Sequence, residues 1–392
     1  GNKFKPFPFS EEENKIDQII EHYKNHLSIK RINENTKTSV DFNIPLATED
    51  NILDIINNLK TTASASPLDK VSPKILKLSA SVITPPLKSI VNSTIITRKY
   101  ISSGQDAVVT PLYKNPKNGS RLNKLHFRPV SVLKAFSKIF EKYYQNSMID
   151  FTNTVLSSAI SAYRKGHSCH HVLLDLTEEW RKYLDNNEVV GAVLMDLSKA
   201  FDCLPHELII AKLAAYGVGK KTLELIYSYL KGRRQGVKIN GFISDLLEIL
   251  SGVPQGSILG PIIFNLFFSD IIYYIKSTRP HNFADDNNLS AHAKTAEITI
   301  EKLEKGANEA VDWLTENEMI ANPDKFKAIL ISKNRSNLSG KEVKIKNQVI
   351  ETQREVESLG VTIDDKLYFK SHISGLCQSA VGKLNALKVT PE

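Results

Sequence analysis

Residues 189–202 read VVGAVLMDLSKAFD, and this stretch decides the fold class. From Val189 to Leu197 it is a nearly continuous apolar run, which is typical of a buried strand. The exception is Asp196, where we expect the strand to end. A carboxylate in that position costs free energy unless it binds a positively charged group. The stretch therefore predicts a buried strand that delivers Asp196 to a cation.

A second acidic motif, FADD, occupies Phe283–Asp286 between short apolar segments. Because neighbouring residues on a strand face opposite ways, Asp285 and Asp286 can share a site only at a tight turn. If that turn lies beside the end of the Asp196 strand, three carboxylates converge. Such oxygen ligands suit Mg²⁺, and two ions about 4 Å apart can activate a 3′-hydroxyl and stabilise a leaving pyrophosphate. A solvated turn is the alternative for an isolated pair of aspartates.

The third motif, SGVPQGSILGP, spans residues 251–261. Its three glycines permit a close approach of the backbone to a ligand before a helix begins. Gln255 can form a hydrogen bond with a base or a sugar. A plain turn is the alternative, because glycines alone are weak evidence.

The chain has 392 residues, a net charge of +8 and 41% hydrophobic residues, which excludes a wholly disordered or collagen-like protein. The basic excess is concentrated in residues 107–144, where eight cations stand against the single acid Glu141. The cations are Lys114, Lys117, Arg121, Lys124, Arg128, Lys134, Lys138 and Lys142. Interspersed prolines and the turn signal Asn118-Gly119 favour loops that present these cations to phosphates. A solvated surface with a chance cluster is the alternative.

Three scattered cysteines form neither a disulfide framework nor a zinc-finger ladder, so we expect an intracellular protein of the nucleus or the cytoplasm. His167, Cys169, His170 and His171 crowd together with no second ligand cluster, so we expect a basic turn there and not a zinc site. The most apolar window, 261–275, is interrupted by polar residues and is shorter than the about 20 residues of a membrane span. Residue 1 is Gly and the first Met is Met148, so we expect a fragment of a longer chain.

Helices dominate the first hundred residues of the predicted secondary structure, and strands alternate with helices after residue 188. The expected early helices are 11–27, 49–59, 72–79 and 86–96, separated by breakers that include Pro85-Pro86. Later helices are expected at 205–217, up to Leu230, after Gly256, over 296–316 and from Phe369 onward. Strands are expected on both sides of Asp285-Asp286, at 328–331 and at 343–345. Residues 236–250 predict a hairpin with a type I′ turn at Asn240-Gly241, and Asp364-Asp365 predicts a hairpin turn.

DLSKAFD, SGVPQGSILGP and FADD, in this order and at these spacings, resemble the core motifs of reverse transcriptases, most closely those of jockey-like non-LTR retrotransposons. The resemblance covers most of the chain. Before the core motifs it includes SASPLDKVSPKILK, VVTPLYKNP, FRPVSVLKAFSKIFEK and SAYRKGHSC, and after them ANPDKFKAIL and ESLGVTIDDKLYFKSHI. Phe283 stands where the family usually has Tyr, but no departure removes a metal ligand or a triphosphate-binding cation.

The resemblance implies an α+β right-hand polymerase fold with fingers, a palm whose antiparallel sheet packs on helices, and a partial thumb. Its divisions are a helical N-terminal extension at 1–100, fingers at 101–188, a palm at 189–335, and a late palm motif with the start of a thumb at 336–392. The implied function is RNA-directed DNA synthesis, with an RNA template, a DNA primer and deoxynucleoside triphosphates as partners and no membrane. The alternative is a catalytically inactive nucleic-acid-binding remnant of such an element. A metal-dependent phosphohydrolase is a weaker alternative, because it leaves SGVPQGSILGP and Phe201 without a purpose.

The resemblance also assigns roles to individual residues. Asp196, Asp285 and Asp286 match the ligands of two Mg²⁺ ions, for which Mn²⁺ can substitute, and Lys325 matches a lysine proposed to protonate the leaving pyrophosphate. The nucleotide-binding residues are Lys114 and Arg128 for the triphosphate, Phe201 for exclusion of a ribose 2′-hydroxyl, and Gln255 with Gly256 for the pocket wall. The turn Leu359-Gly360 resembles the element that holds the primer end.

Overall fold

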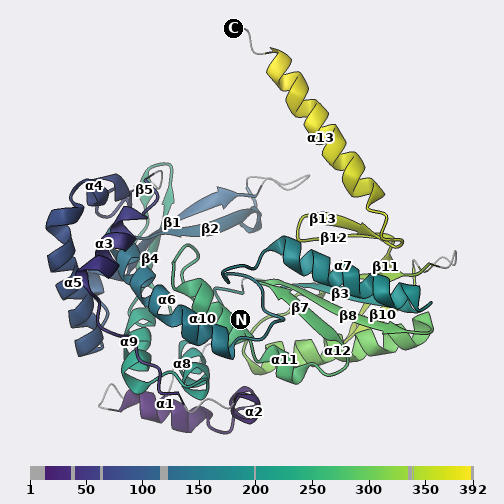
Figure 1. The fold of residues 1–392 in the computed structure, drawn as a ribbon, viewed down its shortest axis with the longest axis horizontal. Coiled ribbons are helices and arrows are strands. Elements are labelled where there is room, and N and C mark those ends of the chain that lie inside the picture. Colours follow the sequence, from purple (N-terminus) through teal and green to yellow (C-terminus); the bar gives the residue numbers. More distant parts are fainter. Residues whose placement is uncertain are drawn as a thin grey trace. The chain divides into compact units, whose positions relative to one another are not determined.

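The computed structural model describes residues 14–36, 40–61, 65–114, 122–197, 200–333, 338 and 340–389 (Figure 1). The chain folds into two compact units. The first unit comprises Gly1–Leu156 and Lys199–Asp270, and the second comprises Ser157–Ser198 and Ile271–Glu392. Both contain helices and sheets, so the chain has the mixed architecture that was expected. None of the helices within the described ranges is long and apolar enough to cross a membrane.

The first unit begins with a series of helices. They are α1 (Lys15–Tyr23), α2 (Leu27–Asn35), α3 (Glu49–Asn57), α4 (Pro73–Leu78) and α5 (Ala80–Thr97). The prediction of one helix up to residue 27 is wrong, because α1 ends at Tyr23 and α2 begins separately at Leu27. The imidazole of His26 accepts a hydrogen bond from Ser28 N at 3.2 Å and so satisfies a free donor at the start of α2. Histidine is not among the residues that usually signal a helix start, so this break could not be predicted from the local sequence.

Helix α5 corrects a second expectation, since Pro85-Pro86 lies inside it and does not separate two helices. Each proline leaves a carbonyl four residues earlier without its helical donor. These carbonyls belong to Ser81 and Val82, both of which are exposed. Water can therefore solvate them, and the helix continues.

The rest of the first unit is a small sheet with helices. The helices are α6 (Ala135–Val155), α8 (His206–Ala215), α9 (Lys220–Leu230) and α10 (Gly260–Phe268), with short 3₁₀ turns at Ser102–Gly104 and Lys124–His126. The strands are β1 (Asp106–Tyr113), β2 (Phe127–Val132), β4 (Arg234–Ile239), β5 (Phe242–Ile243) and β6 (Leu247–Glu248). β1 pairs antiparallel with β2 and parallel with β4. The expected type I′ turn is confirmed, with φ 50° at Asn240 and 89° at Gly241. The strand expected over 242–250 is broken into β5 and β6.

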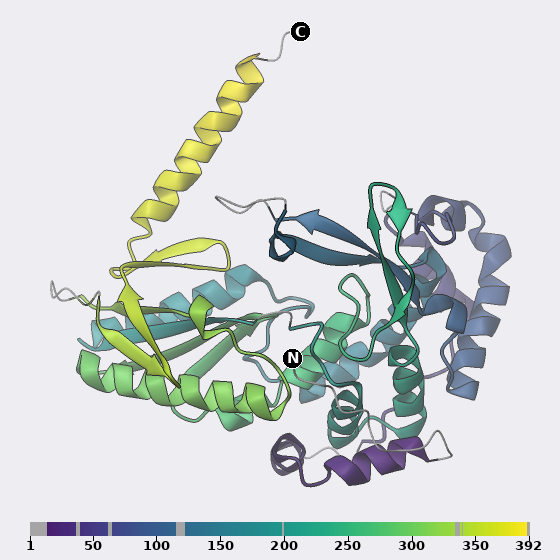
Figure 2. The same cartoon turned by 180° about the vertical axis from the view of Figure 1, so that it is seen from behind.

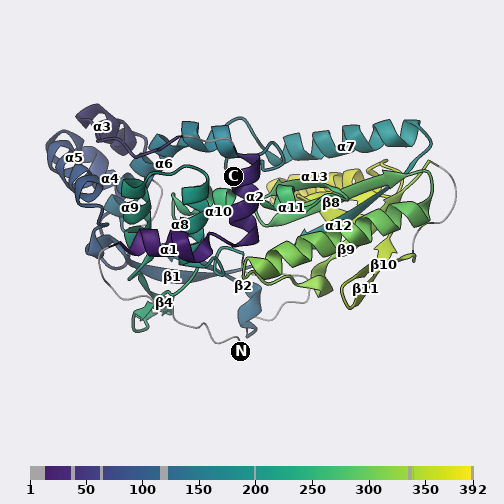
Figure 3. The ribbon, with the colours of Figure 1, turned by 90° about the horizontal axis from the view of Figure 1, so that it is seen from below.

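A six-stranded sheet forms the centre of the second unit, in the order β10-β11-β9-β3-β8-β7. Its strands are β3 (Val189–Asp196), β7 (Arg279–Phe283), β8 (Asp286–Ala293), β9 (Lys327–Ile331), β10 (Glu342–Ile345) and β11 (Gln348–Gln353). All neighbours are antiparallel except β9 and β11. Helices α7 (Cys169–Asp185) and α12 (Ala296–Glu316) run along opposite faces of this sheet, and α11 (Ile271–Tyr274) precedes β7 (Figure 3).

Strand β3 is buried on both faces, as its apolar run predicts. Val190 and Ala192 pack with Trp180 of α7 in one hydrophobic cluster. On the other face, a Cβ added at Gly191 would lie only 2.6 Å from Leu303 of α12, so this position has room only for glycine. Because strand side chains alternate, Asp196 leaves the sheet on the same face as Ala192. The packing of β3 therefore fixes the direction of its terminal carboxylate.

The second unit ends with a two-stranded hairpin and a projecting helix (Figure 2). These elements are β12 (Glu355–Ser358), β13 (Val361–Asp364) and α13 (Lys370–Val389). Leu359 and Gly360 form the hairpin turn, with φ 50° and 80°. The prediction of a hairpin turn at Asp364-Asp365 is wrong. Asp364 ends β13, and its Oδ1 accepts hydrogen bonds from Lys366 N and Tyr368 N on the way to α13.

Candidate active site

The end of β3 and the β7–β8 hairpin place two of the predicted acidic residues on opposed strands and the third in the adjoining turn, all in the second unit. Asp196, the last residue of β3, pairs directly with Asp286, the first residue of β8. Phe283 pairs with Asp286 across the hairpin, so Ala284 and Asp285 form a two-residue turn. The FADD turn therefore lies beside the end of the Asp196 strand. The sequence analysis made the convergence of the three carboxylates depend on this position of the turn.

The electrostatics of this arrangement favour a bound cation. Residues directly opposite on antiparallel strands have Cβ atoms about 5 Å apart, and like charges there are destabilising. Asp285 and Asp286 are exposed, and the Asp196 side chain is 47% exposed, so ions from solvent reach all three. Within the described residues, no group of three or more His, Cys, Asp or Glu side chains is arranged so that it could hold a metal ion by itself. The donor set instead suits Mg²⁺, which is usually held by one or two carboxylates together with substrate phosphates.

The FADD turn has an unusual backbone. Ala284 has φ 57°, as at the first central position of a type II′ turn, where glycine is favoured. A residue with a Cβ in this region costs about 1 kcal/mol, and such strain concentrates at functional sites. Asn287 Nδ2 donates to Asp285 O at 3.0 Å and so holds the turn.

Lys325 joins the carboxylates from the opposite side of β3. It ends the 3₁₀ turn Pro323–Lys325, just before β9, the strand that pairs with β3. Its Nζ lies 3.2 Å from Asp196 Oδ2, and both side chains are about half exposed. The structure therefore places the positive charge of Lys325 at the carboxylate that the sequence predicted to need one.

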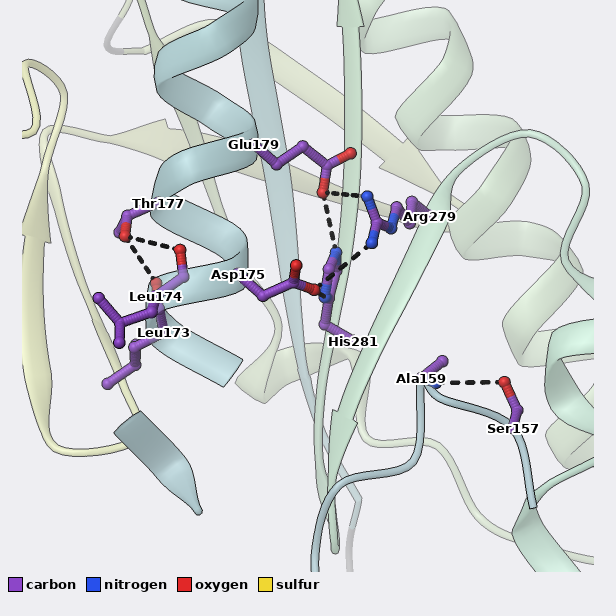
Figure 4. Close-up of polar contacts among 9 residues, drawn as sticks. All are labelled: Ser157, Ala159, Leu173, Leu174, Asp175, Thr177, Glu179, Arg279 and His281. Atoms are coloured by element: carbon purple, nitrogen blue, oxygen red, sulfur yellow. Dashed lines mark hydrogen bonds and ion pairs between the residues drawn. The ribbon is translucent and has the colours of Figure 1, made fainter. Parts of the chain in front are cut away.

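Four polar side chains that sequence analysis missed fix the strand leading to the FADD turn (Figure 4). Arg279 of β7 lies 3.0 Å from Glu179 and 3.4 Å from Asp175, both on α7. His281, 5% exposed, lies 3.2 Å from Glu179 and 3.4 Å from Asp175. Burial acts to raise the pKa of Glu179, but His281 and Arg279 outweigh it and hold that pKa below its ordinary value. These residues are far apart in sequence, and no local pattern signals that they meet.

Tyr163, in the motif SAYRKGHSC, is a second residue that sequence analysis did not single out. The segment before it pairs with β7, since Ser161 N donates to Asn282 O at 3.1 Å and Asn282 N donates to Ala159 O at 2.9 Å. Tyr163 has φ 59° and is 52% exposed. Burial and the nearby negative charge of Asp285 both raise the pKa of its phenol. A positive φ is uncommon for a bulky residue such as tyrosine, so this conformation could not be predicted from the local sequence.

The predicted nucleotide-binding residues lie in the first unit. The loop at 251–256 is packed between two backbone segments. Val253 N donates to Phe201 O at 2.8 Å, and Ser131 N of β2 donates to Gln255 O at 2.7 Å. A Cβ at Gly256, which has φ 115°, would lie 2.7 Å from Ser131 O. Gly256 is therefore required by the close approach of two backbones, whereas the expected close approach of a ligand stays a prediction.

Phe201 and Gln255 each have a neighbour that constrains their side chains. The ring of Phe201, half-buried, stacks on Phe264 of α10 with 4.5 Å between ring centroids and 17° between planes. Gln255 Nε2 lies 3.4 Å from both carboxylate oxygens of Asp202. Sequence analysis missed Asp202 as a partner of Gln255, although it is the last residue of DLSKAFD.

Lys114 and Arg128 lie on one two-stranded ribbon. Arg128 of β2 pairs with Leu112 of β1, and Lys114 N donates to His126 O at 2.8 Å. This register puts Lys114 and Arg128 on the same face of the ribbon. Both side chains are exposed. Lys117, Arg121 and the turn at Asn118-Gly119 lie outside the described residues.

Neutralising either cation is expected to weaken nucleotide binding. A hydrogen bond to a charged partner contributes about 1.5–3 kcal/mol, so Lys114→Gln or Arg128→Gln is expected to raise the KM for deoxynucleotides by about ten- to a hundredfold. The measurement is steady-state primer extension at varied nucleotide concentration. Lys124→Gln, an exposed lysine between the same strands, is the matched control and should change the KM less than about twofold. An unchanged KM in both Lys114→Gln and Arg128→Gln would mean that the segment is only a solvated basic surface.

The side chain of His206 contacts the glycine-rich loop at Gly252. We expect the burial of this side chain to make the stability of the first unit decrease in acid. The imidazole of His206 is buried and Nε2 donates to Gly252 O at 2.8 Å. Burial lowers its pKa to about 4, although the Gly252 hydrogen bond opposes this. Because the folded pKa is below the unfolded value, the folded state binds fewer protons, and stability is lost as pH falls from 6.5 towards 4.

The expected loss is about 3 kcal/mol in the free energy of unfolding over that interval. His206→Gln keeps a donor for Gly252 O but does not titrate. Between pH 6.5 and pH 4, the free energy of unfolding of this variant should therefore fall by about 3 kcal/mol less than that of the wild type. Urea unfolding of both proteins between pH 7 and pH 4 measures the difference. Parallel pH curves would show that His206 is not held neutral by the fold.

Comparison with known proteins defines the class of this chain. The family model described as reverse transcriptase (RNA-dependent DNA polymerase) matches residues 115–363, which is more than half of the chain. The chain therefore belongs to the reverse transcriptase family. This match includes all three carboxylates, Lys325, Arg128 and the glycine-rich loop.

Its relatives are enzymes of non-LTR retrotransposons, so the expected resemblance is confirmed. The chain is 25% identical over 278 residues to the "Probable RNA-directed DNA polymerase from transposon BS" of Drosophila melanogaster, covering 67% of this chain and 30% of the relative. It is 23% identical over 304 residues to the "RNA-directed DNA polymerase from mobile element jockey" of the same species, covering 75% of this chain and 32% of the relative. The corresponding X-element protein is 25% identical over 262 residues, covering 64% of this chain and 28% of the relative. The chain thus spans less than a third of the length of these relatives.

Proposed function

We propose that this chain carries the polymerase activity of a non-LTR retrotransposon, joining deoxynucleotides to a primer 3′-hydroxyl with RNA as the template. The observation that carries the proposal is the register of β3 and β8, which opposes Asp196 and Asp286 beside the turn that contains Asp285. The family membership and the names of the relatives support RNA-directed DNA synthesis as the reaction.

Asp196, Asp285 and Asp286 are the proposed ligands of two Mg²⁺ ions, with Mn²⁺ as a substitute. When bound, these ions activate the primer hydroxyl and stabilise the leaving pyrophosphate. The opposed carboxylates supply hard oxygen ligands and repel each other without a cation, so the donor set fits the ions. Lys325 holds a proton at Nζ, 3.2 Å from Asp196 Oδ2, and is the proposed donor to the leaving pyrophosphate.

The residues of the first unit are the proposed nucleotide-binding set. Lys114 and Arg128, on one face of the β1–β2 ribbon, bind the triphosphate through charge-assisted hydrogen bonds. Gln255 and Gly256 line the pocket, and the ring of Phe201 excludes a ribose 2′-hydroxyl by steric clash.

We assign the regions of the chain in the terms of a right-hand polymerase. Residues 1–100 are a helical extension, 101–188 the fingers, 189–335 the palm with the catalytic aspartates, and 336–392 the late palm motif and the start of a thumb. The largely antiparallel β7–β8–β3–β9 arrangement supports the palm assignment. The projecting helix α13 supports the assignment of a thumb beginning near its N-terminus.

The alternative function is a catalytically inactive remnant that binds nucleic acid. Primer extension on matched RNA and DNA templates, with Mg²⁺ present or chelated, separates the two. The proposal expects extension on RNA that depends on Mg²⁺. Tight binding of the template and primer without extension would favour the remnant.

A further inference from the structure

Helix α6 holds the loop that carries Gln255 and Gly256. Glu141 Oε2 accepts hydrogen bonds from Ile258 N at 2.6 Å and from Leu259 N at 3.2 Å. Gln145, one helical turn further along α6, donates from Nε2 to Ile258 O at 3.0 Å. Side chains of one helix therefore form hydrogen bonds with both the N–H and the carbonyl of Ile258. We call Glu141 and Gln145 the α6 clamp.

The clamp uses a carboxyl group that is buried in the core. Glu141 is 0% exposed, and burial raises the pKa of its carboxyl, while the positive charge of Arg233, itself 1% exposed, acts to lower that pKa. Arg233 is itself held by α9, because its Nη1 donates to Tyr229 O at 3.2 Å and its guanidinium stacks 4.6 Å from the Tyr229 ring. Burying a charge is expensive unless it is paired and hydrogen-bonded, so a buried carboxylate aimed at a loop backbone calls for an explanation beyond packing.

The other end of the same loop is also fixed, which leaves little freedom between the two anchors. Gln255 O accepts from Ser131 N at 2.7 Å. Only Gly256 and Ser257 separate this anchor from Ile258, and Ser257 Oγ accepts from Gly260 N at 3.1 Å. A displacement of Ile258 is therefore transmitted directly to Gly256 and Gln255.

We propose that Glu141 and Gln145 are positioning residues for nucleotide binding, which set Gln255 and Gly256 through the peptide groups of Ile258. This inference rests on the proposed function, because it assumes that Gln255 and Gly256 contact the incoming nucleotide. It assigns a specific task to two residues of FRPVSVLKAFSKIFEKYYQ that neither touch the substrate nor belong to the carboxylate set. A clamp with a purely structural role would lower stability and leave nucleotide affinity unchanged.

Gln145→Leu is the first test, since Gln145 is only half-buried and the variant should fold. Loss of one hydrogen bond predicts a rise of about three- to tenfold in the KM for deoxynucleotides, with kcat and the template–primer Kd changed less than about twofold. Amide hydrogen exchange in the peptide containing Ile258 and Leu259 should accelerate. Asn146→Leu, the same change at the next, exposed position of α6, is the control and should alter none of these quantities. A normal KM in Gln145→Leu would overturn the proposal.

Glu141 needs two variants, because Glu141→Gln leaves the buried positive charge of Arg233 without the Glu141 carboxyl that interacts with it electrostatically. The double variant Glu141→Leu with Arg233→Met removes both buried charges, and such replacements often restore stability. We expect its melting temperature to exceed that of Glu141→Gln, while the KM for deoxynucleotides remains at least about fivefold raised because the Ile258 and Leu259 donors have lost their acceptor. A KM that returns to normal along with the melting temperature would show that the clamp acts only through stability.

The wild-type protein distinguishes failure of this inference from failure of the proposed function. If the wild type extends a primer and the clamp variants behave like Asn146→Leu, only the inference fails. If the wild type neither extends a primer nor binds deoxynucleotides, the proposed function fails, and the inference fails with it.

Discussion

Asp196→Asn is expected to abolish primer extension, lowering the rate by at least about a thousandfold. Metal ions contribute several kcal/mol of charge stabilisation to such a reaction, and each 1.4 kcal/mol is about tenfold in rate. Asp285→Asn should have the same effect, since its carboxylate lies at the tip of the turn beside Asp286. Single-turnover extension at saturating nucleotide and template–primer measures the loss.

Stability separates this effect from unfolding. Removing the Asp196 charge relieves its repulsion with the opposed Asp286 but loses the ion pair with Lys325, which is half exposed and therefore weak. We expect these changes to offset each other, so that the melting temperature and the template–primer Kd stay close to wild type. Asp365→Asn, which changes one member of the other acidic pair, is the matched control and should retain full activity. Extension by Asp196→Asn at more than about a tenth of the wild-type rate would contradict the assignment, because that loss is only about 1.4 kcal/mol.

Phe201→Val is expected to admit ribonucleotides. The ring is proposed to exclude the 2′-hydroxyl by a clash, and a smaller side chain removes that clash. We expect the ratio of ribonucleotide to deoxynucleotide incorporation to rise at least about tenfold, or ~1.4 kcal/mol in discrimination. Single-nucleotide incorporation of both sugars by the wild type and the variant gives the ratio.

Because Phe201 stacks on Phe264, its truncation also lowers the stability of the protein, and this effect needs a control variant. Phe201 is half-buried and in ring contact, so its truncation should also lower the free energy of unfolding, by less than the about 3–5 kcal/mol of a fully buried Phe. Phe264→Leu breaks the same stack and keeps the Phe201 ring. If both variants shifted the sugar ratio equally, the effect would come from packing and not from a gate. An unchanged ratio in Phe201→Val would remove the gate and weaken the DNA-synthesis proposal.

Several elements of the fold were predictable because their signals are local. The Asn240-Gly241 turn follows from residues that tolerate positive φ, and the structure has φ 50° and 89° there. The helix expected over 296–316 matches α12, Ala296–Glu316, whose apolar stripe has helical spacing and whose start is capped by Thr295. A local rule failed at Pro85-Pro86, which lies inside α5 because the two carbonyls left without helical donors are on exposed residues.

The sequence by itself determined the chemical identity of the candidate site in this protein. It placed Asp196 at the end of a buried strand and Asp285 in a turn between strands, because hydrophobic alternation and run length depend only on neighbouring residues. The ordered motifs also determined the reverse transcriptase family, which the match over 115–363 confirms.

Only the tertiary structure decided which of these residues meet. The pairing of Asp196 with Asp286, the approach of Lys325 to 3.2 Å from Asp196, and the grip of Glu141 on Ile258 all join residues distant in sequence. A shift of one residue in the register of β3 would turn Asp196 to the other face, and both strand registers look alike locally. The register is fixed by packing, in which Gly191 admits Leu303 of α12 on one face and Val190 packs with Trp180 of α7 on the other. Burial on two faces exists only once the helices have packed against the sheet. The sequence alone therefore identifies the carboxylates, and the packed core determines which of them lie opposite each other.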